Sequence, residues 1–200
     1  FQLSVLLFDL DHFKQVNDTF GHQVGDMLIT TVASRLSSML RKTDLVARVG
    51  GDEFVLLLQG SNLDFAPAVV ATQILDAVAQ PFLVGEQEHS VSASLGISVC
   101  PRDGSDPDLL IRNADAAMYQ AKAAGRNSYQ FYNQSMNSVA RRRLMIESGL
   151  RRACDAGELD LHFQPRVETR TWKIIGAEAL LRWTDPELGS ISPAEFIPIA

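Results

Sequence analysis

Cysteine and long apolar runs are both scarce in this 200-residue chain. The 2 cysteines, Cys100 and Cys154, lie far apart and show no metal-ligand spacing, which argues against a disulfide framework and favours a reducing compartment. No apolar run reaches the roughly 20 residues that span a bilayer. The N-terminus also lacks the basic stretch followed by an apolar stretch that marks a secretion signal. We therefore expect a cytoplasmic location.

Positive charge is also in short supply. The chain has 18 Lys and Arg against 24 Asp and Glu, which gives a formal net charge of -6. Proteins that bind a nucleic-acid backbone concentrate Lys and Arg into a strongly basic face, so we expect no nucleic-acid polymer as a partner. The chain opens in strand-like sequence without an initiator methionine, and we interpret it as a fragment. Any membrane attachment would belong to a region before residue 1.

Strand-like and helix-like segments alternate along the chain. The apolar pattern and the breakers predict, in order, a strand over 3–10, a helix over 24–41, strands over 45–49 and 54–58, a helix over 64–79, a strand over 90–99, a helix over 110–125 and a strand over 128–132. These segments form one α/β domain, which we place at 1–133. A connecting helix over 134–157 follows, and a second domain begins at 158–200 with strands over 159–167 and 174–183.

Acidic side chains mark two of the predicted turns. Asp9 stands at the end of the first strand, and Asp52 and Glu53 follow Gly50 and Gly51 at the tip of a predicted β-hairpin. Nucleotidyl transfer needs divalent cations held by carboxylates, and glycines let a backbone approach phosphates closely. Mg²⁺ suits such a site, because it takes hard oxygen ligands and is commonly bound by one or two carboxylates plus the substrate's phosphates. Taken singly, each feature has a simpler explanation, as a turn residue, a helix cap or an exposed hairpin.

Three sequence runs together resemble the GGDEF-domain diguanylate cyclases. They are Arg48-Val49-Gly50-Gly51-Asp52-Glu53-Phe54, the earlier run Asp9-Leu10-Asp11-His12-Phe13-Lys14 with Asn17, Asp18, Gly21, His22, Gly25 and Asp26, and Ala121-Lys122-Ala123-Ala124-Gly125-Arg126-Asn127. The resemblance covers residues 3–132. It implies an α+β fold with a central, mostly antiparallel sheet flanked by helices, of the nucleotide-cyclase or palm-like kind, and the condensation of two GTP into cyclic di-GMP with release of pyrophosphate.

The resemblance also implies roles for individual residues. Asp9, Asp52 and the backbone carbonyl of Leu10 would hold Mg²⁺ or Mn²⁺, Glu53 would support a second metal, and Asp52 is the candidate base near the 3′-hydroxyl. The residues expected to bind GTP are Asn17 and Asp26 on the guanine edge, Lys122 and Arg126 on the triphosphate, and His22 with the backbone amides near His12 and Phe13 beside it. Adenine would leave Asn17 and Asp26 unpaired, which favours GTP over ATP.

Simpler roles are open for several of these residues. Asn17 and Asp18 could cap the helix that follows them, His22 could be a surface histidine, and Lys122 with Arg126 could be a solvated helix end that favours the helix dipole. Two other functions are also open for the domain. It could bind GTP without turnover and regulate the following domain, or it could act as a cyclic di-GMP receptor.

Two further expectations concern partners of the domain. One domain holds one GTP and the product needs two, so the resemblance implies an antiparallel homodimer as the active unit. Arg41 and Asp44 fit the RxxD pattern that resembles the family's product-inhibition site, where a guanidinium and a carboxylate would grip cyclic di-GMP. A helix-end ion pair is the simpler explanation of these two residues.

The C-terminal part resembles a second family, the EAL-type cyclic di-GMP phosphodiesterases. The resemblance is carried by Phe163-Gln164-Pro165, by Glu178-Ala179-Leu180-Leu181-Arg182-Trp183 and by Phe196-Ile197-Pro198. It implies that Glu178, within the motif that includes Leu180, is a metal ligand and that Gln164 and Arg182 contact the dinucleotide. The remaining metal ligands and the general base of such an enzyme are not within these residues, so we expect a truncated EAL barrel that does not hydrolyse cyclic di-GMP.

Overall fold

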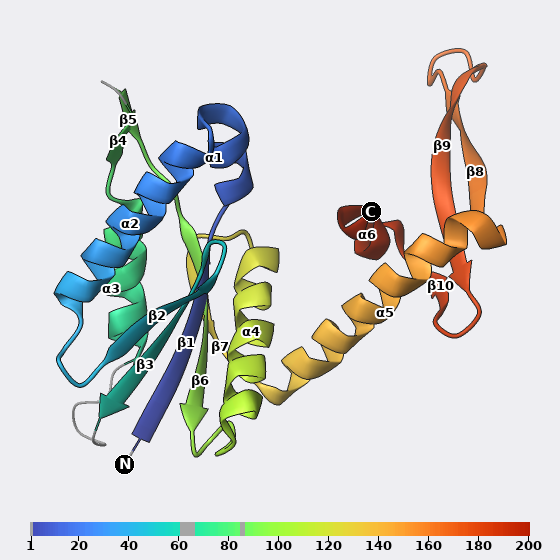
Figure 1. The fold of residues 1–200 in the computed structure, drawn as a ribbon. Helices are drawn as coiled ribbons and strands as arrows, with labels where there is room; N and C mark the ends of the chain where they lie inside the picture. Colours follow the sequence, from blue (N-terminus) through green and yellow to red (C-terminus); the bar gives the residue numbers. More distant parts are fainter. Residues whose placement is uncertain (1, 61–66, 85–86) are drawn as a thin grey trace. The chain divides into compact units, whose positions relative to one another are not determined.

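A five-stranded sheet forms the centre of the N-terminal part of the chain (Figure 1). The structure is a computed structural model and describes residues 2–60, 67–84 and 87–200. The strands follow the order β2-β3-β1-β6-β7. They are β1 (Gln2–Leu10), β2 (Leu45–Gly50), β3 (Glu53–Gly60), β6 (Ala93–Cys100) and β7 (Ser128–Phe131). All neighbouring pairs are antiparallel except β6 and β7, so the mostly antiparallel sheet expected from the family resemblance is confirmed.

Helices cover both faces of this sheet. The helices of this part are α1 (Phe13–Phe20), α2 (His22–Met39), α3 (Pro67–Ala79) and α4 (Pro107–Ala123). Leu6, Phe8 and Leu10 of β1 belong to the core on the face of α2 and α3, whereas Val5 and Leu7 pack with buried residues of α4. Because successive side chains of a strand point to opposite faces, a strand covered on both sides reads as one continuous apolar run.

The predicted segments agree with the observed elements to within a few residues, but several observed elements were not predicted. The segment 64–66 of one expected helix lies outside the described residues, and α3 begins at Pro67. The strand expected from residue 90 begins at Ala93. The helix α1 was not predicted, although Phe13, Val16 and Phe20 stand at helical spacing, because the pattern covers only 8 residues. Also not predicted were the short strands β4 (Phe82–Val84), β5 (Gln87–His89) and β10 (Gly189–Ile191), and the short helix α6 (Pro193–Phe196).

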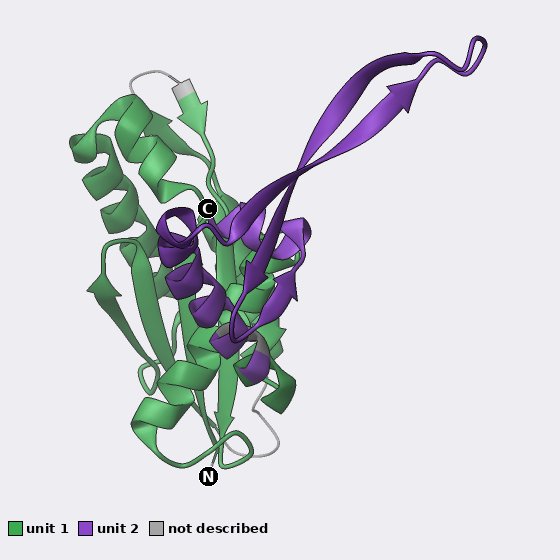
Figure 2. Ribbon diagram, turned by 90° about the vertical axis from the view of Figure 1, so that its right-hand side faces the viewer, with its two compact units in different colours: residues 1–137 green, residues 138–200 purple. Residues whose placement is uncertain are grey.

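The chain divides into two compact units, residues 1–137 and 138–200 (Figure 2). The division falls inside α5 (Gln134–Ala156), and the domain limits at 133 and 157 stay a prediction. The second unit has a three-stranded antiparallel sheet with the order β10-β9-β8, in which β8 is Leu159–Val167 and β9 is Ile174–Asp185. Its small core is built around Trp183, Ile146 and Phe196. None of the helices within the described residues has the length and apolar character that a membrane crossing requires.

Candidate active site

The register of β1 and β3 brings two of the predicted acids together. Asp9 is the direct cross-strand partner of Glu53, the first residue of β3. Gly51, with a φ of 52°, lies in the turn between β2 and β3, and Asp52 follows it. The left-handed conformation at Gly51 favours glycine. The hairpin therefore sets Asp52 and Glu53 beside the end of β1, as the sequence predicts.

Lys122 is the basic partner of this acid group. Asp9 has the same strand parity as Val5 and Leu7, so its side chain lies on the face that α4 covers. There the Nζ of Lys122, in the last turn of α4, lies 2.8 Å from Oδ1 of Asp9. Lys122 is thus in the last turn of α4, as the simpler reading has it, and its ammonium group also forms an ion pair that joins α4 to β1.

A shallow pocket collects residues from three distant sequence runs. It has a volume of about 280 Å³ and is lined by Asp9, Leu10, Asp11, His12, Phe13, Lys14, Asp52, Lys122 and Arg126. Five site residues predicted from the first two runs and the two predicted from the third thus share one surface, and Glu53 is the cross-strand partner of Asp9. The three sequence runs that were matched separately converge in space.

Asp9 of the pocket and its cross-strand partner Glu53 both have raised pKa values. Burial raises the pKa of Asp9 above its ordinary value, while the hydrogen bond and positive charge of Lys122 oppose this rise. Burial also raises the pKa of Glu53, and the neighbouring Asp9 adds to that effect. A positive charge placed beside Asp9 and Glu53 therefore stabilises their ionised forms.

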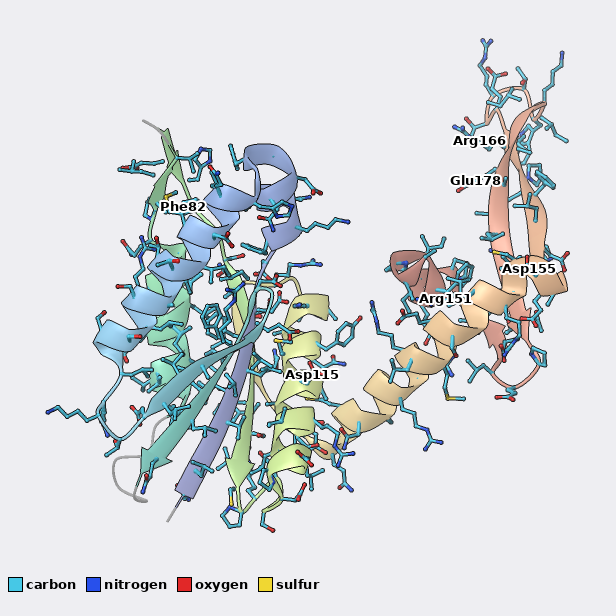
Figure 3. All side chains as sticks on the ribbon, in the orientation of Figure 1. Phe82, Asp115, Arg151, Asp155, Arg166 and Glu178 are labelled. Atoms are coloured by element: carbon cyan, nitrogen blue, oxygen red, sulfur yellow. The ribbon has the colours of Figure 1, made fainter. Side chains whose placement is uncertain are left out.

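Sequence reasoning missed Asp115, a further acid on α4 (Figure 3). Burial raises the pKa of Asp115, and the charge of Asp115 contributes to the raised pKa of Glu53. Asp115 precedes Lys122 by two helical turns, so both residues project from the same side of α4. That spacing is the signal that could have indicated it.

Asp11 was noted in the sequence only as part of a motif, yet it is the most deeply buried acid of the site. Its side chain is 4% exposed and accepts hydrogen bonds from Ser92 Oγ at 2.6 Å, Ser94 Oγ at 2.7 Å and the backbone N–H of Asn127 at 3.1 Å. The backbone N–H of Asp11 also donates to the carbonyl of Ser92 at 2.9 Å. No sequence pattern pointed to these partners, because they lie more than eighty residues away along the chain.

The residues predicted to contact guanine lie on the helix pair α1 and α2, and the described surface of the 280 Å³ pocket does not include them. A Cβ placed on Gly25 would lie 2.0 Å from Oδ1 of Asn17, so the Asn17 side chain rests directly on the backbone of Gly25, next to Asp26. The idea that Asn17 caps the following helix is wrong, because Asn17 lies inside α1 and Gly21 is the N-cap of α2. His22 is exposed at the start of α2.

Arg41 and Asp44 form a tight turn after α2. The backbone N–H of Arg41 donates to Oδ2 of Asp44 at 3.1 Å, and the N–H of Asp44 donates to the carbonyl of Arg41 at 3.0 Å. Both residues line a pocket of about 160 Å³, together with Gln59 and Gln73. This pocket is separate from the one that contains Asp9.

The residues of the EAL-type motifs lie on the β8–β9 hairpin of the second unit. Gln164 and Glu178 are direct cross-strand partners, and Arg182 pairs with Asp160 further along the same strands. Alternation along β9 gives Glu178, Leu180 and Arg182 the same face of the hairpin. Gln164 and Glu178 are both exposed, and Figure 3 shows Glu178 on the open part of β9.

The donor groups near Asp9 are suited to a hard divalent cation. Asp9, Asp52 and the Leu10 carbonyl supply only oxygen atoms, the ligand type that Mg²⁺ and Mn²⁺ prefer. Within the described residues, no three His, Cys, Asp or Glu side chains come close enough to hold a metal by themselves. An ion at this place would thus depend on oxygen ligands from a substrate as well, which is the usual situation for Mg²⁺ with phosphates.

A mostly antiparallel sheet with helices on both faces, acids at its strand ends and a lysine on a covering helix, defines an α+β domain with a charged pocket at one end of the sheet. The family model for the "Diguanylate cyclase, GGDEF domain" matches residues 1–128, and the chain belongs to this family. The model for the EAL domain matches residues 147–200.

Individual relatives match nearly the whole of this chain. The chain is 44% identical over 199 residues to the "Bifunctional diguanylate cyclase/cyclic di-GMP phosphodiesterase MucR" of Pseudomonas aeruginosa, and 36% identical over 198 residues to the "Cyclic di-GMP phosphodiesterase NbdA" of the same organism. These matches cover 100% and 99% of this chain but 29% and 25% of the two relatives. A solved EAL/GGDEF domain protein from M. capsulatus matches with a TM-score of 0.62 and 47% identity, over 66% of this chain and 85% of that one.

Proposed function

We propose that the first unit is a diguanylate cyclase that condenses two GTP into cyclic di-GMP and releases pyrophosphate. The observation that carries this proposal is the convergence of Asp9, Asp52, Lys122 and Arg126 on one pocket, with Glu53 opposite Asp9. Nucleotidyl transfer requires carboxylates that hold a metal cation and positively charged side chains that bind phosphates. An intact set of both favours catalysis over GTP binding alone.

The residues of the pocket divide the work of holding the triphosphate. Asp9, Asp52 and the Leu10 carbonyl would hold Mg²⁺ or Mn²⁺, with Glu53 beside them, and the bound ion would neutralise charge on the phosphates. Lys122 and Arg126 would bind phosphate oxygens, and His22 and the backbone amides near His12 and Phe13 would add donors. Lys122 already lies at the pocket through its ion pair with Asp9 and would exchange this partner for phosphate.

Base selection and proton transfer are assigned to other side chains. Asn17, which rests on Gly25, and the neighbouring Asp26 would pair with the guanine edge, and adenine would leave these groups without partners. Asp52 would accept the proton of the attacking 3′-hydroxyl. The first unit of each chain would hold one GTP, so two chains would meet in an antiparallel homodimer, in which each 3′-hydroxyl attacks the α-phosphate bound by the other chain.

Substitution of Asp52 tests this proposal in the full-length protein. With GTP and Mg²⁺ we expect cyclic di-GMP and pyrophosphate, and we expect Asp52→Ala to reduce the rate by about a thousandfold, because several kcal/mol of transition-state stabilisation are lost. Asp76→Ala removes an exposed carboxylate on α3 and should leave the rate unchanged. Turnover that survives in Asp52→Ala contradicts the proposal.

The name of one relative favours a second candidate function. Because NbdA is named as a phosphodiesterase, the first unit could bind GTP without turnover and regulate an EAL domain. Tight GTP binding without pyrophosphate release, combined with GTP-dependent hydrolysis of cyclic di-GMP by the full-length protein, would support this candidate. The pocket of Arg41 and Asp44 fits a product-binding role under both functions, and Arg41→Ala should then weaken binding of cyclic di-GMP.

A further inference from the structure

The Asp11 carboxylate joins three segments of the first unit at a single buried point. Its donors are the hydroxyls of Ser92 and Ser94 and the backbone N–H of Asn127, and all three are neutral groups. A carboxylate removed from water has a large cost unless its oxygens are hydrogen-bonded, so this buried acid depends on these donors. Such an arrangement fixes positions as well as satisfying polar atoms.

One of the three segments carries the proposed metal ligand Asp9. Ser94 is the direct cross-strand partner of Asp9 on the neighbouring strand β6. The carbonyl of Ser92, just before β6, accepts a hydrogen bond from the backbone N–H of Asp11, and the Ser92 hydroxyl donates one to Asp11 Oδ2. The end of β1 is thus tied to the start of β6 through both the backbone and the side chain of Asp11.

The third segment, the turn at Arg126 and Asn127, carries the proposed phosphate ligand Arg126. Arg126 and Asn127 have φ values of 63° and 45°, a left-handed conformation that side-chain-bearing residues rarely adopt. The backbone N–H of Arg126 donates to the carbonyl of Ala121 at 3.0 Å, and that of Asn127 donates to Asp11. Two such residues in succession persist only where the surroundings hold them, and Asp11 supplies one of the two hydrogen bonds that do so.

We propose that Asp11 is a positioning residue, which holds the Arg126–Asn127 turn against the end of β1 so that Arg126 and Asp9 face the same triphosphate. This inference rests on the proposed function, because it assigns Arg126 to the phosphates. A purely structural role predicts something different. Loss of Asp11 would then lower stability, but its effect on nucleotide binding would not depend on the presence of Arg126.

A double-mutant cycle in the full-length protein separates the two roles. The probe is 3′-deoxy-GTP with Mg²⁺, which lacks the attacking hydroxyl, and its dissociation constant is measured by calorimetry. We expect Asp11→Ala and Arg126→Ala each to weaken binding about 10–100-fold, the usual range for residues that orient a ligand-binding group. In the Arg126→Ala background, Asp11→Ala should add no more than about a twofold effect. If the fold-losses of affinity of the two single variants multiply in the double variant, the proposal is overturned.

Asp11→Asn covers the case in which Asp11→Ala does not fold. Its amide oxygen can still accept the Asn127 N–H and its NH₂ group can donate to Ser94 Oγ, whose hydroxyl can turn to accept. We expect a smaller loss of binding, about three- to tenfold, since the hydrogen bonds lose their charged acceptor. This loss should also vanish in the Arg126→Ala background, and its persistence there would overturn the proposal.

The wild-type measurement separates this inference from the proposed function. Wild-type protein that fails to bind 3′-deoxy-GTP overturns both. Wild-type protein that binds the probe, together with a folded Asp11→Ala variant of equal affinity, overturns the positioning role alone and leaves the proposed function standing.

Discussion

Two strands of equal length, one in each unit, differ in how far their motif residues are exposed to solvent. β1 and β8 each have 9 residues, but β1 is buried along most of its length and β8 is exposed along nearly all of it. Helices cover β1 from both faces, whereas Leu161 and Phe163 of β8 are 58% and 65% exposed. The covered strand ends in Asp9, whose pKa burial raises, and the open hairpin carries Glu178 in contact with water. Among the described residues, burial by neighbouring elements thus polarises the acid of β1, and no element of this chain does the same for the acid of β9.

The strongest test of this contrast is Trp183→Ala in the second unit. Trp183 is 1% exposed, packs edge-on against Phe196 and donates its Nε1–H to Glu158 at 3.1 Å. Its loss from so small a core should destabilise this unit by about 3–5 kcal/mol. Denaturant unfolding monitored by hydrogen exchange in each unit should show the second unit weakened and the first unchanged. An equal loss in both units would mean that their cores do not act separately.

Two strand glycines give a matched pair of intermediate size. A Cβ on Gly96 of β6 would lie 1.9 Å from the Ala114 carbonyl oxygen and 2.2 Å from the Met118 nitrogen, so Gly96→Ala must push α4 away from the sheet. We expect the first unit to lose about 1–3 kcal/mol or more of stability. A Cβ on Gly176 of β9 meets nothing within 4 Å, so Gly176→Ala should stabilise the second unit slightly. Thermal unfolding of both variants checks this, and equal effects would contradict the contrast in cover.

The smallest expected effect concerns the pH dependence of metal binding without nucleotide. Burial raises the pKa of Asp9 and Glu53, and a protonated carboxyl does not bind Mn²⁺, so affinity should begin to fall at a higher pH than for ordinary carboxylates as the solution is acidified. Lys122 lowers the pKa of Asp9, so Lys122→Met should move this fall to a still higher pH. Titration of bound Mn²⁺ by electron paramagnetic resonance between about pH 5 and pH 8 measures both profiles. A shift of the Lys122→Met profile to lower pH would contradict the assignment.

The stability of the protein without metal should depend on pH in the matching direction. For Asp9, Glu53 and Asp115 the folded state binds the proton more tightly than the unfolded state does, because burial raises each pKa. Their contribution to the free energy of unfolding is therefore largest at low pH and declines as the pH rises through the raised values. Added Mn²⁺ should offset this decline.

Much of the fold and of the candidate site could be read from the residues. The apolar run over 3–10 predicted the buried strand, and the glycines before Asp52 predicted the hairpin that sets the acids at its tip. The helix α1 escaped because its 8 residues are too short a stretch for helical periodicity to be read with certainty, although Phe13, Val16 and Phe20 stand at helical spacing. What would cover the apolar residues of β8 and β9 could not be read, since alternation in a sequence indicates one apolar face and does not identify the element that packs on it.

The sequence by itself determined which chemical groups this protein has and, through three separated runs, which family it belongs to. Those runs are local, and so are the turns and helix ends that place their residues. Only the tertiary structure decided that Lys122 pairs with Asp9, that Asp115 lies near Glu53 and that Asp11 holds the turn of Asn127. These contacts join residues far apart in the chain, and they follow from strand register and from helix packing on a particular face, which no short stretch of sequence encodes.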